Sequence, residues 1–119
     1  MKIAITSQGT NMQSALDPRF GRAANFIIVD SETGQWSAES NSINANATQG
    51  AGIQAAKRVV ELGAEALVTG HVGPKAFAAL KAGNVQIYMG ASGTVADALQ
   101  QFKQGRLKAA GAADVEGHW

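Results

Sequence analysis

The sequence predicts an α/β fold in three layers, with a five-stranded mixed sheet flanked by three helices. In the second half of the chain, short apolar segments typical of buried strands alternate with helical segments that each end at a glycine. Strands joined through helices run parallel, whereas the turn at Ser31–Gly34 is typical of an antiparallel hairpin. Together these patterns predict strand order 3-2-1-4-5, in which only the second strand is antiparallel.

Composition limits the classes of function. The 119 residues include ten basic and nine acidic side chains, so no strong field favours nucleic acids or membranes as partners. The absence of cysteine excludes thiolate metal ligands and cysteine nucleophiles. No apolar run approaches the length of a membrane span and no signal peptide precedes the first strand, so we expect a cytoplasmic protein.

The first half of the chain contains three of the strands. Lys2–Thr6 is β-branched and opens the fold, and Asn25–Asp30 and Gln35–Ser40 form the hairpin. Between the first two strands lies a long polar connection, Ser7–Arg22. Connections of this length in small domains are usually functional or disordered, and Phe20 within it favours a packed loop.

The second half begins with Asn41–Gly52, which we expect to be mostly a loop. Strands and helices then alternate. In order, they are a helix at Gly52–Leu62 followed by Gly63, a strand at Ala66–Val68, a helix from Pro74 to Gly83, a strand at Val85–Met89, and a helix from the N-cap Thr94, with Asp97 in a capping box, to Gly105. One domain at 1–107 and a loose tail at 108–119 are therefore predicted.

Four connecting segments are expected to leave the sheet at the same end. They are Ser7–Arg22, Asn41–Gln49, Gly70–Gly73 and Gly90–Gly93. Ligands of open α/β sheets bind at the carboxyl ends of parallel strands, where such loops gather. We call this end of the sheet the rim.

The charges predicted at the rim favour an anion. Arg19, Arg22 and Lys75 lie in or beside the rim loops, and Asp17 is the only carboxylate there. Three helix N-termini add backbone N–H donors and partial positive charge. The alternative is that the arginines are solvated or paired with Asp17 or Asp30, and that the glycines serve only chain geometry.

Metal and catalytic signals are weak. His71 lies in a glycine turn and Met12 and Met89 lie near the rim, but no two of them have the spacing of metal ligands, and a lone histidine is more often a hydrogen-bonded surface group. Nucleophile-elbow, zinc-protease and phosphate-loop motifs are absent, and the strand ends offer too few carboxylates for a two-metal site. We therefore do not expect an enzyme.

Several motifs resemble the dinitrogenase iron–molybdenum cofactor-binding domain family, which includes small nitrogenase-cofactor carriers and a molybdenum–copper protein of sulfate reducers. The matching segments are KIAIT at Lys2–Thr6, DPRFGRAANFIIVD at Asp17–Asp30, TGHVGPKAFAAL at Thr69–Leu80, and VQIYMGASGTVADALQQFKQG at Val85–Gly105. The resemblance covers residues 1 to about 107. The cysteine-free turn with His71 is most similar to that of the molybdenum–copper member.

The resemblance implies a ribonuclease H-like fold and a non-catalytic role in binding, carrying or assembling a metal–sulfur cofactor. The implied cofactor is a molybdenum-containing cluster, with a Mo–Cu sulfide as the specific candidate, and the implied partners are cytoplasmic cofactor-assembly or scaffold proteins rather than nucleic acid or membrane. Without cysteine, such a cluster would be held as a bulky anion by basic side chains, N–H donors and apolar walls. The candidate contacts are Met12, Arg19, Phe20, Arg22, Gly70, His71, Val72, Gly73, Lys75, Met89 and Gly90, and His71 is the one candidate metal ligand.

Two other functions stay open at this stage. One is a scaffold or signalling module that binds a protein through the rim, and the other is an enzyme acting on a small anion or a nucleotide. Metal analysis and an absorption spectrum of protein purified from its native source would separate them from a cluster carrier. The sequence indicates no role for His118 and Trp119.

Overall fold

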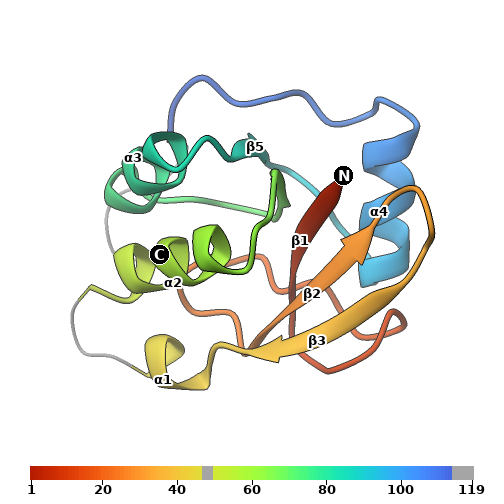
Figure 1. The fold of residues 1–119 in the computed structure, drawn as a ribbon, viewed down its shortest axis with the longest axis horizontal. Helices are drawn as coiled ribbons and strands as arrows, with labels where there is room; N and C mark the ends of the chain where they lie inside the picture. The colour runs from red at the N-terminus through yellow and green to blue at the C-terminus, as the bar shows by residue number, and fades with distance from the viewer. Residues whose placement is uncertain (47–49, 114–119) are drawn as a thin grey trace.

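A five-stranded mixed sheet forms the centre of the structure, a computed structural model that describes residues 1–46 and 50–113 (Figure 1). The strand order is β3-β2-β1-β4-β5. Their bounds are β1 Lys2–Ser7, β2 Asn25–Asp30, β3 Trp36–Ser40, β4 Ala66–Val68 and β5 Gln86–Tyr88.

The pairing of the strands confirms the predicted topology. β1 lies antiparallel to β2, with Ile3 opposite Val29, and parallel to β4, with Ile3 opposite Ala66. β2 and β3 are antiparallel, and β4 and β5 are parallel. β2 is therefore the antiparallel strand of the sheet, and β1, β3, β4 and β5 all end at the rim.

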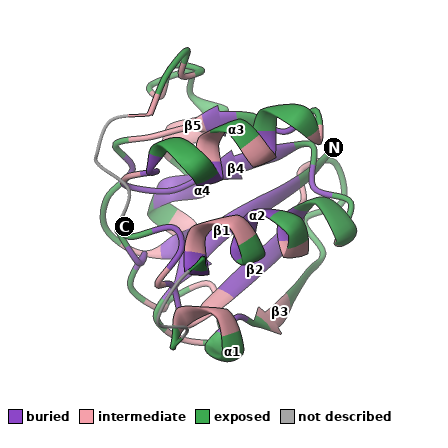
Figure 2. Ribbon diagram, turned by 90° about the vertical axis from the view of Figure 1, so that its left-hand side faces the viewer, coloured by how far each residue is buried: buried purple, intermediate pink, exposed green. Residues whose placement is uncertain are grey.

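Helices cover both faces of the sheet (Figures 1 and 2). α2 (Ala51–Glu61) and α3 (Pro74–Ala82) enclose one core cluster, and α4 (Val95–Lys103) encloses the other. Neighbouring strand residues point to opposite faces, so Ala4 belongs to the first cluster and Ile3 to the second. These three helices and the capping box at Thr94 agree with the sequence prediction.

A fourth helix, α1 (Ser42–Ala45), lies in the segment that was expected to be mostly loop. It is a single turn whose backbone bond runs from Ala45 N to Asn41 O at 2.9 Å. Asn41 is buried, and its side-chain amide donates to Ala23 O at 2.8 Å. A polar turn held by an asparagine has no apolar periodicity, which explains why the sequence pattern did not reveal it.

The beginning of the expected loose tail is paired with the sheet. Ala110 N donates to Ile87 O at 2.7 Å, and Ala109 forms an antiparallel bridge with Tyr88. The segment at Ala109 and Ala110 thus runs beside β5, and residues 114–119 of the expected tail, His118 and Trp119 included, lie outside the described residues. Across residues 1–46 and 50–113, no helix is long and apolar enough to cross a membrane.

Candidate functional site

The loop after β1 runs along the rim and is bonded to the loops after β4 and β5. Leu16 N donates to Gly93 O at 2.9 Å, and His71 N donates to Pro18 O at 2.7 Å. Ala96 N also donates to Met12 O at 2.9 Å. The long connection is therefore a packed loop, as predicted, because its backbone groups are satisfied by its neighbours.

Arg19 and His71 are neighbours at the rim. The two backbone bonds that flank Arg19, from His71 N to Pro18 O and from Phe20 N to His71 O at 3.2 Å, form an isolated parallel bridge between these residues. Residues paired in such a bridge lie side by side. Arg19 is exposed and His71 is half-buried, so the bridge brings a basic residue and a histidine side by side at the rim.

Gly70 lies where three of the four rim loops meet, those after β1, β4 and β5. A Cβ atom at this position would lie 2.6 Å from Pro18 O and 2.7 Å from Pro18 Cα. The carbonyl of Gly70 accepts from Gly90 N at 3.0 Å. A glycine is therefore required here for the close approach of the loop that carries Arg19.

The N-termini of the helices at the rim are not equivalent. α3 begins at Gly73 and Pro74 without a side-chain cap and without an acidic residue in its first turn, which contains the exposed Lys75. At α4, by contrast, the Asp97 carboxylate accepts from Thr94 N at 3.0 Å. The Asp97 carboxylate already neutralises the partial positive charge at the N-terminus of α4. Of these two helices, α3 is therefore the one whose N-terminus can still attract an anion.

Three residues predicted to contact the cofactor, Phe20, Val72 and Arg22, are held by other parts of the fold. The side chains of Phe20 and Val72 are fully buried in the α2–α3 core cluster, so they pack beneath the rim and cannot form walls of an exposed site, which corrects that expectation. Arg22 Nη1 donates to Ala45 O at 3.1 Å, so this guanidinium closes the last turn of α1.

The two methionines pack against opposite faces of the sheet. Met12 contacts the α4 cluster, and Met89 contacts the α2–α3 cluster. Both are half-buried. The structure therefore does not place the two thioethers in one core cluster, and only Met89 shares a face with the turn that contains Val72.

Among the described residues, the carboxylate of Asp17 forms no ion pair with an arginine side chain, the arrangement considered above as the alternative to an anion site. It is nearly buried, and its Oδ1 accepts from the backbone N of Arg19 at 3.1 Å. Beneath it, the hydroxyls of Thr6 and Thr69 are fully buried and hydrogen-bonded. Sequence reasoning missed these threonines, although each follows a run of buried apolar residues at the end of a parallel strand.

The chemistry of the rim fits an anion better than a bare metal ion. Within the described ranges, 1–46 and 50–113, no group of three or more His, Asp or Glu side chains could hold a metal. What the structure gathers instead is Arg19, His71, the uncapped N-terminus of α3 and Lys75. These groups can surround an anion that brings its own inner ligands.

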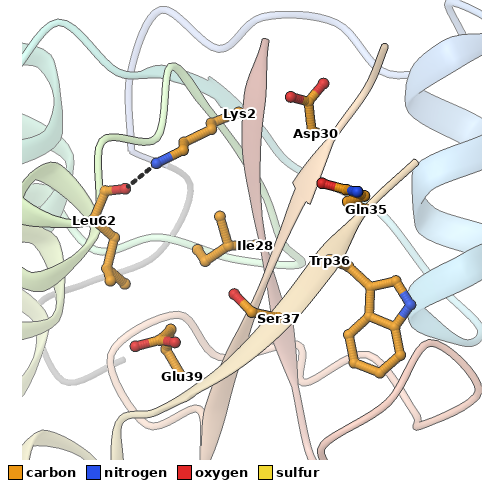
Figure 3. A pocket seen from close by; sticks show the side chains of 8 residues that line it. All are labelled: Lys2, Ile28, Asp30, Gln35, Trp36, Ser37, Glu39 and Leu62. Carbon is orange, nitrogen blue, oxygen red and sulfur yellow. Dashed lines mark hydrogen bonds between the residues drawn. The ribbon is translucent and has the colours of Figure 1, made fainter. Parts of the chain in front are cut away.

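A pocket of about 370 Å³ lies at the other end of the sheet (Figure 3). Its floor is Ile28, and its charged groups already have partners. Lys2 Nζ donates to Leu62 O at 3.4 Å, and Glu39 forms an ion pair with Arg58 at 3.1 Å. Its lining, which contains no predicted site residue, comprises Lys2, Ile28, Asp30, Gln35, Trp36, Ser37, Glu39 and Leu62.

Comparisons with known proteins find relatives along most of the chain. Residues 1–105 match the model of a family described as dinitrogenase iron–molybdenum cofactor. The apo form of the orange protein from Desulfovibrio gigas is 39% identical with a TM-score of 0.93, and the alignment covers 96% of each chain. A NifB-like Thermotoga protein of the DUF35 family is 38% identical with a TM-score of 0.84 over 98% of each chain. An uncharacterized Methanocaldococcus jannaschii protein is 27% identical over 91% of this chain and 90% of its own length.

Proposed function

Because this chain belongs to the dinitrogenase iron–molybdenum cofactor family, we propose that it is a non-catalytic carrier of a molybdenum-containing metal–sulfur cluster. The specific cargo we propose is a Mo–Cu sulfide, held non-covalently at the rim. The observation that carries this proposal is the parallel bridge that sets Arg19 beside His71.

The proposal follows from the donors that the chain offers. Protein-bound molybdenum, copper and iron–sulfur units usually take soft anionic sulfur ligands from cysteine, which this sequence lacks. A cluster that carries its own sulfides needs no protein thiolate. As a bulky anion, it is attracted by the Arg19 guanidinium, by Lys75 and by the free backbone N–H groups at the start of α3.

In this proposal His71 is a secondary contact. One imidazole can hold one metal edge, but a single bond does not make a metal cage. The fold also has its own cores on both faces of the sheet, so it should stand without the cargo. The folded apo form of the orange protein, which is 39% identical, supports this separation of folding from binding.

Titration with tetrathiomolybdate, alone and with copper, tests the proposal by absorption and by metal counting. We expect Arg19→Ala to weaken binding about tenfold or more, because a charge-assisted hydrogen bond is worth roughly 1.5–3 kcal/mol. Lys57→Ala is the matched control, since it removes a positive charge that is also exposed but belongs to α2. Binding should also weaken as salt concentration rises.

Substitution of Arg22 affects the fold as well as the charge at the rim. Arg19→Ala combined with Arg22→Ala should weaken binding at least as much as Arg19→Ala alone, but Arg22 also closes α1 through Ala45 O. The single Arg19 variant is therefore the cleaner test. Equal affinity of Arg19→Ala and Lys57→Ala would place the anion elsewhere and overturn the proposal.

Metal counting on protein purified from its native source separates the carrier from the two other functions considered above. A carrier should copurify with molybdenum in proportion to the cluster it holds. A scaffold that works through protein contacts, or an enzyme acting on a small anion, should contain no molybdenum under the same conditions.

A further inference from the structure

Two threonines lie beneath the rim at the ends of adjacent parallel strands. Thr6 belongs to β1, Thr69 follows β4, and both are fully buried. We infer that Thr6 and Thr69 are positioning residues, whose hydroxyl chain holds the loop of Arg19 against the turn of His71. This inference rests on the proposed function, because the geometry that it maintains is that of the anion site.

The direction of the hydrogen bonds in this chain is determined. Thr6 Oγ1 lies 2.6 Å from Asp17 O. Because a carbonyl oxygen only accepts, the single hydroxyl proton of Thr6 is donated to Asp17 O. The two threonine hydroxyls are 2.8 Å apart. Thr69 must therefore donate to Thr6, which gives the sequence Thr69 to Thr6 to Asp17 O.

The hydrogen-bonded threonine hydroxyls lie close in sequence to the backbone bridge between Arg19 and His71. Asp17 precedes Arg19 by two residues, and Thr69 precedes His71 by two residues. Asp17 N also donates to Thr6 O at 3.0 Å, so both backbone groups of Asp17 are bound to Thr6. The hydroxyl chain thus joins the two segments immediately before the residues that the site needs side by side.

Packing alone does not require hydroxyls at these positions. Valine has nearly the same shape and suits a buried strand at least as well, whereas a buried hydroxyl must be compensated by hydrogen bonds. A fully satisfied buried polar chain instead selects one arrangement of the segments that it joins. Here that arrangement is the one in which His71 N donates a hydrogen bond to Pro18 O at 2.7 Å.

The direction of the chain predicts a graded effect. Thr6→Val leaves both Asp17 O and the Thr69 hydroxyl without their partner, whereas Thr69→Val leaves the bond from Thr6 to Asp17 O intact. We expect Thr6→Val to weaken tetrathiomolybdate binding about three- to tenfold and Thr69→Val to weaken it less. Thr6→Ser, which keeps the hydroxyl, should restore most of the affinity.

The test combines affinity with NMR. Backbone amide shifts and hydrogen exchange at His71 and Phe20 report the bridge in the absence of any ligand, and tetrathiomolybdate titration reports the site. Val59→Ala is the control, because it destabilises the α2–α3 core without touching the rim. A merely structural role predicts that Thr6→Val behaves like Val59→Ala, with a lower melting temperature but unchanged binding by the folded protein.

The outcomes separate this inference from the proposed function. Faster exchange at His71 and Phe20 with weaker binding in Thr6→Val, both rescued by Thr6→Ser, supports the inference. Unchanged exchange and shifts in Thr6→Val overturn it, and so does unchanged affinity when the wild type binds. If the wild type does not bind tetrathiomolybdate, the proposed function and the role in binding both fail, and the NMR measurements still decide whether the hydroxyls hold the bridge.

Discussion

Substitution of Gly70 tests the close approach on which the rim depends. In Gly70→Ala the new Cβ would lie 2.6 Å from Pro18 O, where ordinary contact begins at 3.4 Å. The two nearest obstructing atoms are backbone and the third is the Cβ of Pro18, so no rotation of a side chain relieves the contact, and the loop of Pro18 must move. Overpacking of this kind typically costs about 1–3 kcal/mol of unfolding free energy.

The displacement should appear at the bridge as well as in the stability. Moving Pro18 away lengthens the bond from His71 N to Pro18 O, so we expect faster hydrogen exchange at the His71 amide. Urea denaturation and native-state exchange measure both effects. Gly111→Ala is the control, because its Cβ would meet no atom within 4 Å. Equal stability and equal His71 exchange in the two variants would refute the reasoning.

Two further predictions concern the capping of α4 and the hairpin turn. Thr94→Ala should lower the unfolding free energy by about 1 kcal/mol and Thr94→Ser should not, because Asp97 N donates to Thr94 Oγ1 at 3.1 Å, and equal urea midpoints would contradict this. Backbone donation from Glu32 and Thr33 lowers the pKa of Asp30 below its ordinary value of 3.8. The hydrogen-bonded carboxylate therefore stabilises the fold at neutral pH, and this stabilisation is lost as the pH falls through the lowered pKa. Asp30→Asn should thus be less stable than the wild type at pH 7, and the difference in unfolding free energy should shrink below pH 3.8. Denaturation measured across this pH range checks the prediction.

The sheet could be predicted because its connections restrict the topology. The Ser31–Gly34 turn requires an antiparallel neighbour for β2, and each helical crossover requires parallel strands. These local patterns set the directions of the strands, and the predicted order, which the structure confirms, gathers the loops at one end. The pairing of Ala109 and Ala110 with β5 could not be predicted in this way, because an alanine- and glycine-rich segment has neither strand nor helix periodicity.

The candidate site could be predicted only in part. The loops that carry Arg19 and His71 follow from topology, but their pairing depends on backbone bonds that no spacing reveals. Phe20 and Val72 were expected to form apolar walls of the site, and both are fully buried in the α2–α3 core cluster. The hydroxyl of Thr6 gives no signal, since threonine is an ordinary strand residue.

The central claim is that a preformed anionic cluster binds at the rim mainly through charge and N–H donors, with His71 as a secondary contact. Reconstitution of His71→Ala with tetrathiomolybdate and copper, followed by absorption and counting of both metals per chain, tests it most directly. Binding through charge and N–H donors predicts a folded variant that retains part of the cluster and loses it as salt is raised. Complete loss of the cluster from a well-folded His71→Ala protein would instead make histidine the principal ligand and rule out binding mainly by charge.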